Sequence, residues 1–67
     1  MKITEVRTEK YEWSYRKKPR GWGMWAFGNK SESQVWFFSG SYADAKKQAL
    51  KKANEEFEKY EALYVLP

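Results

Sequence analysis

The stretch from Ser41 to Tyr60, SYADAKKQALKKANEEFEKY, is the strongest secondary-structure signal in the chain. Ser41 is placed as a helix N-cap, and Asp44 stands three residues later where a capping box usually has Glu or Gln. Apolar residues then recur at spacings of three and four, with Leu50 at the edge of the stripe: Tyr42, Ala45, Ala49, Ala53, Phe57 and Tyr60. This pattern predicts an amphipathic helix of about four to five turns.

Two strands are predicted immediately before this helix. Trp22–Phe27 and Gln34–Ser39 are rich in aromatic and β-branched residues, which favour strands. The short loop between them begins Gly28-Asn29-Lys30-Ser31, so we expect an antiparallel pair. After the helix, the apolar run from Ala62 to Leu66 predicts a short strand that Pro67 ends.

The N-terminal segment from Ile3 to Tyr15 ends in strict alternation. Tyr11, Trp13 and Tyr15 share one parity, and this period of two indicates a half-buried strand. The earlier residues Thr4, Val6 and Thr8 have the opposite parity, which predicts a bulge or bend between them. The expected fold is a single α+β domain over residues 1–67, a three-stranded antiparallel meander with one helix and a short C-terminal strand, in the order β-β-β-α-β.

Composition limits the chemistry of the chain. It has 67 residues, which suits one small domain, and no Cys or His. Disulfides, thiolate or imidazole metal sites, and Cys-His or Ser-His catalytic pairs are therefore excluded. We expect no cofactor, no metal and no enzymatic activity. The 4 Trp, 5 Tyr and 4 Phe supply enough apolar area for a core that has no disulfide or metal to stabilise it.

The formal net charge of +4 belongs to the first part of the chain. Arg16-Lys17-Lys18-Pro19-Arg20-Gly21 forms a basic turn next to Trp22 and Trp25, and such a turn can present cations to phosphates beside rings that stack on bases. The alternative is an ordinary solvated turn whose charges keep the protein in solution. We weigh the two equally.

The predicted helix carries its charges in an unusual order. Lys46, Lys47, Lys51 and Lys52 lie in its first half, and Glu55, Glu56 and Glu58 in its last. This order opposes the helix macrodipole, which favours acids at the N-terminus. Either an anionic partner near the helix start selects it, or pairs at a spacing of four residues and solvent offset the cost, which is the interpretation we favour.

The rings outnumber what one alanine-rich helix can cover. With Tyr11, Trp13, Tyr15, Trp25, Phe27, Val35 and Phe37 towards the helix, the outer face would carry Trp22, Met24, Trp36 and Phe38. Reversing the parity of either later strand exchanges its set and still leaves large apolar groups outside. Such a patch indicates a binding or self-association surface, unless the N-terminal arm, the last strand or sheet curvature covers it.

Several motifs resemble those of AP2/ERF-type DNA-binding domains and of the arm-binding domains of tyrosine integrases. They are Tyr15-Arg16, Pro19-Arg20-Gly21-Trp22-Gly23-Met24-Trp25-Ala26, Val35-Trp36 and Gly40-Ser41-Tyr42. The resemblance implies a three-stranded sheet that enters the major groove, with contacts from Arg16, Lys18, Arg20, Trp22 and Trp25. The strands Trp22–Phe27 and Val35–Phe38 contain no Arg or Lys, so stacking and phosphate contacts are favoured over base-specific readout.

The sequence therefore predicts a small non-enzymatic protein that binds nucleic acid or a nucleotide phosphate. The candidate binding residues are Arg16, Lys17, Lys18, Arg20, Trp22, Trp25, Trp36, Lys46 and Lys47. The alternative is a small inhibitor or protein-interaction module of the kind short phage genes encode, which would dock on a host protein, or form a homodimer, through exposed rings. The charged N-terminus has no signal-peptide pattern and no apolar run is long enough to span a bilayer, so we expect a cytoplasmic location and no membrane partner.

Overall fold

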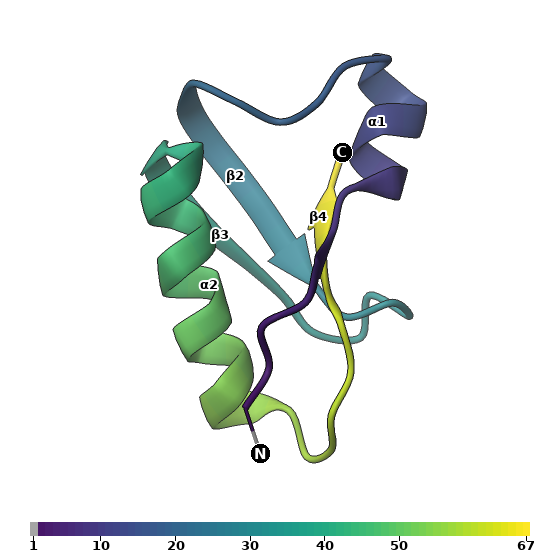
Figure 1. The fold of residues 1–67 in the computed structure, drawn as a ribbon, viewed down its shortest axis with the longest axis vertical. Helices are drawn as coiled ribbons and strands as arrows, with labels where there is room; N and C mark the ends of the chain where they lie inside the picture. The colour runs from purple at the N-terminus through teal and green to yellow at the C-terminus, as the bar shows by residue number, and fades with distance from the viewer. Residues whose placement is uncertain (1) are drawn as a thin grey trace.

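The computed structural model describes residues 2–67 and confirms the α+β class. Two helices and a four-stranded sheet form one compact body, with the longer helix running along one face of the sheet (Figure 1). The elements follow in the order β1 (Val6–Arg7), α1 (Glu9–Tyr15), β2 (Trp22–Gly28), β3 (Val35–Ser41), α2 (Tyr42–Glu56) and β4 (Leu63–Leu66).

The sheet has the spatial order β1-β4-β2-β3, which differs from the predicted meander. The antiparallel β2–β3 pair is confirmed. The C-terminal strand β4, however, inserts between β2, to which it is antiparallel, and β1, to which it is parallel. All four residues of β4 are buried, and a short continuous apolar run suits a central strand covered on both faces.

The prediction of a strand at the end of the Ile3–Tyr15 segment is wrong. Only Val6 and Arg7 form a strand there, and residues 9–15 form the helix α1. The change in parity that suggested a bulge marks the end of β1 and the start of this helix. Tyr11 and Tyr15 are four residues apart, so a helix also places them on one face, and their ring centroids lie 4.6 Å apart.

Local features stabilise α1 despite its length of seven residues. Glu9 and Glu12 lie in its first turn, where negative charge is favourable. Arg16 closes the helix in a left-handed conformation with φ of 60°, and its backbone N–H donates to the carbonyl oxygen of Glu12. Consequently the basic segment after Tyr15 is a loop from α1 to β2, not the turn of a β-hairpin.

The helix α2 begins as predicted. The backbone N–H of Asp44 donates to the hydroxyl oxygen of Ser41 at 3.2 Å, which confirms the N-cap. The helix ends at Glu56, because Phe57 takes an extended conformation, so Tyr60 lies outside the helix and is exposed rather than continuing the apolar stripe.

The core lies between α2 and the sheet. Ala45, Ala49 and Ala53 are completely buried, and their small side chains let the helix approach the rings of β2 and β3. Phe27 is completely buried as well, and Tyr42 packs its ring against both Phe27 and Trp25. Burial raises the pKa of the Tyr42 phenol above its usual value, because the charged form loses hydration.

A polar contact ties the N-terminal arm to this core. The Asn54 side chain accepts a hydrogen bond from the Ile3 backbone N–H at 2.7 Å and donates to the Ile3 carbonyl oxygen at 3.0 Å. Ile3 is almost completely buried, so its backbone groups need partners within the protein. The N-terminal arm therefore packs into the core between α2 and β4.

We predict that Ala49→Leu lowers the free energy of unfolding by about 1–3 kcal/mol, because added carbon atoms cannot fit between α2 and the sheet. The control is Ala43→Leu, which adds the same atoms at an exposed position of the same helix. Chemical denaturation followed by circular dichroism measures both. Equal stability of the two variants would contradict the tight packing of the alanine stripe.

Candidate functional site

One part of the sheet has no helix over it. Residues paired across antiparallel strands share a face, and the pairs Met24–Ser39 and Ala26–Phe37 point away from α2. We call the surface formed by Trp22, Met24, Val35 and Phe37 the open face. Its largest rings are strongly exposed: the Trp22 residue is 83% exposed and Phe37 64%.

The prediction of which β3 side chains face α2 is wrong: Val35 and Phe37 are exchanged with Trp36 and Phe38. Trp36 and Phe38 point towards α2 and are half-buried, and the Trp36 ring lies 5.5 Å from that of the buried Phe57. Val35 and Phe37 point outwards instead. The prediction of large apolar groups on the outer face is therefore confirmed for Trp22 and Met24, whereas β3 contributes the other set of its residues.

Helix α1 covers the rest of this side of the sheet. Tyr64 and Leu66 of β4 are paired with Gly28 and Ala26, and they are buried although α2 lies on the opposite face. The Lys10 ammonium of α1 lies 4.9 Å from the centroid of the Tyr64 ring, within the range of a cation–π contact. The open face is therefore limited to β2 and β3.

A groove of about 470 Å³ lies where α1, the basic loop and the open face meet. It is bordered by aromatic, aliphatic and cationic side chains together with small residues of β2: Tyr11, Tyr15, Lys17, Arg20, Trp22, Gly23, Met24, Trp25, Ala26, Phe37, Leu66 and Pro67. None of these side chains is acidic. Cations and exposed rings that are spread from Tyr15 to Phe37 in the sequence are thus brought to one place.

The two cations of the groove are electrostatically uncompensated. Among residues 2–67, ion pairs involve Arg7 and Lys10, and neither Lys17 nor Arg20 forms one. Both are exposed at the edge of the groove. An anion that entered would meet two free cations next to the Trp22 ring.

The remaining predicted residues lie elsewhere or are buried. Trp25 borders the groove but is only 6% exposed; its ring packs against Tyr11 and Tyr42, and its Nε1–H donates to the Gly40 carbonyl oxygen at 3.1 Å. Trp25 is thus a core ring, not a free stacking surface. Trp36 is not a free stacking surface either, because its ring faces α2 and packs against Phe57.

The other predicted cations are not gathered into the groove. Lys46 and Lys47 belong to α2, in the layer on the far side of the sheet, and the Lys46 ammonium lies 5.8 Å from the Tyr42 ring centroid. Lys18 is exposed and does not border the groove. Arg16 borders a different hollow on the outer side of α1.

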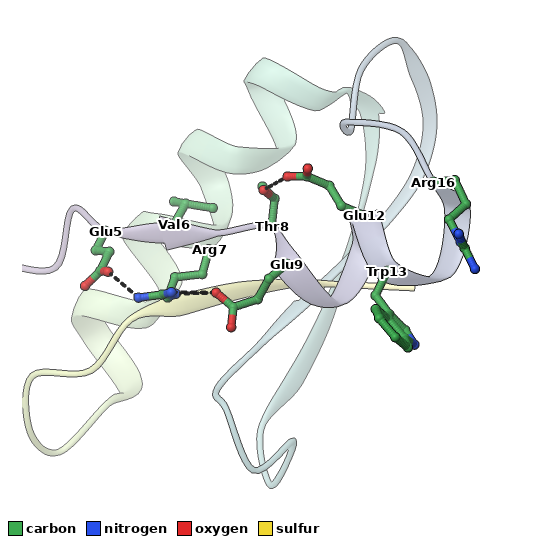
Figure 2. Close-up of a pocket in the computed structure, with 8 residues that line it drawn as sticks. All are labelled: Glu5, Val6, Arg7, Thr8, Glu9, Glu12, Trp13 and Arg16. Carbon is green, nitrogen blue, oxygen red and sulfur yellow. Dashed lines mark hydrogen bonds and ion pairs between the residues drawn. The ribbon is translucent and has the colours of Figure 1, made fainter.

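This second hollow, of about 630 Å³, is more open to solvent than the groove, and Figure 2 shows the residues that line it. Its residues are Glu5, Val6, Arg7, Thr8, Glu9, Glu12, Trp13 and Arg16. The Arg7 guanidinium forms ion pairs with Glu9 at 2.6 Å and with Glu5 at 3.3 Å, and the hydrogen bond to Glu9 raises the pKa of Arg7. The Thr8 hydroxyl donates to the Glu12 carboxylate.

The second hollow differs from the groove because acidic side chains border it. Trp13 stands at its edge with 81% exposure, and Arg16 there forms no ion pair among the described residues. However, Glu5, Glu9 and Glu12 place three carboxylates in the same hollow and would repel an anion. Within residues 2–67 no group of three or more acidic side chains is arranged to hold a metal ion. The groove beside the open face is accordingly the better candidate site.

Sequence reasoning missed three rings of this site. The sequence pattern predicts a strand for Tyr11 and Tyr15, which lie in α1, and it places Phe37 on the helix-covered face. The spacing of four between the two tyrosines, together with acids at Glu9 and Glu12, was the signal for α1. The parity of β3 had no comparable signal, because Val35, Trp36, Phe37 and Phe38 are all apolar.

Comparison with protein-family models, with curated proteins and with solved structures finds no match. The likeness to AP2/ERF-type and integrase arm-binding domains therefore rests on the short motifs alone. Within the described fold, neither helix is long and apolar enough to cross a membrane.

We predict that Trp13 and Trp22 account for most of the tryptophan emission that acrylamide can quench, because Trp25 and Trp36 are shielded by the core. Replacing both, as Trp13→Phe with Trp22→Phe, should shift the emission to shorter wavelength and strongly reduce the quenching constant. A double variant that is quenched as readily as the original chain would contradict the described exposure of the rings.

Proposed function

We propose that this chain is a non-enzymatic protein that binds a nucleic acid strand or a nucleotide through the groove beside the open face. The observation that supports this most is that Lys17 and Arg20, which form no ion pair within the described fold, lie next to the exposed Trp22 ring in a groove without acidic side chains. Phosphate groups are the anions that most commonly occur together with flat rings able to stack.

The cations and the rings would have different roles. Lys17 and Arg20 would contact phosphate oxygens, and Arg20 has the planar fork that suits them. Trp22 would stack on a base, with Tyr15 and Phe37 bordering the same space. Base–aromatic stacking contributes about 1–3 kcal/mol per base and tolerates any sequence.

An unpaired strand suits this surface better than a duplex. Bases within a duplex are stacked on each other, and sequence is read from their edges by groups such as Arg and Asn. The strands β2 and β3 present no Arg, Lys, Asn or Gln among residues 22–28 and 35–41. Exposed rings beside phosphate-binding cations are instead typical of single-strand binding.

The proposal of a non-enzymatic role rests on the side chains of the groove. Its side chains include no carboxylate, imidazole or thiol that would act as a general base at neutral pH. Binding without chemical conversion is the role that these groups support.

A second candidate function is docking on another protein. The observation that favours it is the apolar character of the open face away from the groove, where Met24, Val35 and Phe37 are exposed without a charged neighbour between them. Exposed apolar surfaces of this kind are enriched at protein interfaces. Such an interface would depend on Phe37 and Met24 more than on Lys17 and Arg20.

Titration of labelled single strands, of the matching duplex and of free nucleotides at two salt concentrations tests the proposal. We expect tight single-strand binding that quenches Trp22 and weakens steeply with salt, since counterions are released from the strand. Lys17→Glu with Arg20→Glu should reduce affinity at least tenfold and lower the salt slope by about 0.7 for each lost phosphate contact.

The matched control is Lys30→Glu with Lys59→Glu, which changes the net charge equally at exposed positions away from the groove. It should retain most of the affinity. Equal losses in the two double variants would show a non-specific charge effect and contradict the groove as the site. No binding of any strand or nucleotide would reject the function and leave protein docking as the remaining candidate.

A further inference from the structure

The outer edge of β3 presents unpaired backbone groups. β3 is the last strand in the order β1-β4-β2-β3 and pairs with β2 alone. Two backbone hydrogen bonds lie at the two ends of the β2–β3 pair and continue its register. The Tyr42 N–H donates to the Gly21 carbonyl oxygen, and the Asn29 N–H donates to the Gln34 carbonyl oxygen. Since such bonds alternate along an antiparallel pair, Trp36, Phe38 and Gly40 point their backbone groups at β2.

The backbone N–H and C=O groups of Val35, Phe37 and Ser39 therefore point away from the sheet. Among residues 2–67 no side chain or loop forms a hydrogen bond with them. Proteins usually protect such an edge with charged residues, proline, a bulge or a covering segment. β3 has the sequence VWFFSGS and carries no charge and no proline.

The opposite edge of the sheet is protected in the usual way. β1 has only two residues, and its Arg7 forms ion pairs with Glu5 and Glu9 along that edge. The long uncharged edge is thus confined to β3.

We propose that β3 pairs with β3 of a second copy of this chain, antiparallel and with the two-fold axis at Phe37, to form an eight-stranded sheet. In this register Phe37 lies opposite Phe37 of the second copy, and Val35 opposite Ser39. All the outward-pointing groups then pair with one another, because hydrogen-bonded positions fall opposite hydrogen-bonded positions. A strand that pairs with itself in this way forms a closed, self-complementary interface.

The side chains on both faces suit this register. On the open face the two exposed Phe37 rings would meet, and on the covered face Trp36 would lie opposite Phe38 of the second copy. Aromatic pairs across neighbouring strands stabilise a sheet. No like charges are placed opposite each other, since β3 carries none.

The charges of α2 indicate that the partner is a second copy rather than an unrelated strand. Gln48, Lys51, Lys52 and Glu55 of α2 line one hollow together with Phe38 of the edge strand β3. A two-fold axis perpendicular to the sheet makes the two α2 helices antiparallel. Because Trp36 packs against Phe57 at the end of α2, an axis at Phe37 places Lys51 and Lys52 of each helix towards Glu55 and Glu56 of the other, which gives a physical reason for this part of the charge order that opposes the macrodipole.

This dimer brings the two grooves towards each other. The two-fold axis places both open faces on the same side of the extended sheet, and Phe37, which borders the groove of its own copy, lies at the axis. The inference rests on the β3 edge and on α2, and it holds whether or not the groove binds a nucleotide.

Sedimentation velocity over a range of protein concentrations tests the proposal with Ser39→Pro. Proline at this position removes an outward N–H without removing a hydrogen bond to β2. We expect the original chain and the control Ser39→Ala to dimerise, and Ser39→Pro to raise the dissociation constant at least about tenfold, because each dimer loses two hydrogen bonds. A monomeric original chain, or a dimer unaffected by Ser39→Pro, would overturn the proposal.

Disulfide cross-linking tests the proposed β3–β3 pairing independently, and it decides the test if Ser39→Pro fails to fold. The chain has no cysteine, so a single introduced thiol can only pair between copies. In the proposed register two Cα atoms at position 37 lie about 5.5 Å apart, which a disulfide can bridge. Phe37→Cys should form a disulfide-linked dimer in mild oxidant. Ser39→Cys should not, because position 39 lies opposite Val35 of the second copy, four residues away from position 39 of that copy. The reverse result, or equal cross-linking, would overturn the proposed register.

Discussion

The contact between the alanine stripe of α2 and the rings of the sheet is the constraint on which the rest of the structure depends. Ala45, Ala49 and Ala53 are completely buried, so the helix lies close to β2 and β3. A chain of 67 residues has few elements with which to bury its apolar surface. Because α2 covers one face of the sheet, only the seven-residue helix α1 is left to cover the other face.

The open face and the groove follow from this shortage of covering elements. Helix α1 is long enough to bury Tyr64 and Leu66 of β4, but it leaves β2 and β3 exposed. The loop after α1 must then return to the start of β2, where the Gly21 carbonyl accepts a hydrogen bond from the N–H of Tyr42 at the start of α2. This connection brings Lys17 and Arg20 beside Trp22, so the position of the charge is set by the packing of the core.

Much of the fold was predictable because its signals were local. The N-cap and the spacing of three and four defined α2, and runs of Val, Phe and Trp defined β2 and β3. Helix α1 was not predicted, because Tyr11, Trp13 and Tyr15 fit a strand by parity and its seven residues depend on contacts with β4 and Trp25. The central position of β4 is likewise set by pairing between distant residues.

The candidate site was predictable in part. Lys17, Arg20 and Trp22 were identified from a basic segment next to rings, and the structure brings them together. Trp25 and Trp36 could not be distinguished from Trp22 by sequence, since only the register of each strand decides which ring faces α2. The exposed Phe37 was missed for the same reason.

The central claim is that the open face and its groove, not the helix-covered face, form the binding surface. Nuclear magnetic resonance tests it most directly, because the four tryptophan indole N–H signals report on different parts of the fold. On addition of a short single-stranded oligonucleotide, the account predicts a large shift of the Trp22 signal and little change for Trp36 and for Trp25, whose indole N–H is held by the Gly40 carbonyl. Shifts confined to Trp36 or Trp13, with Trp22 unchanged, would contradict it.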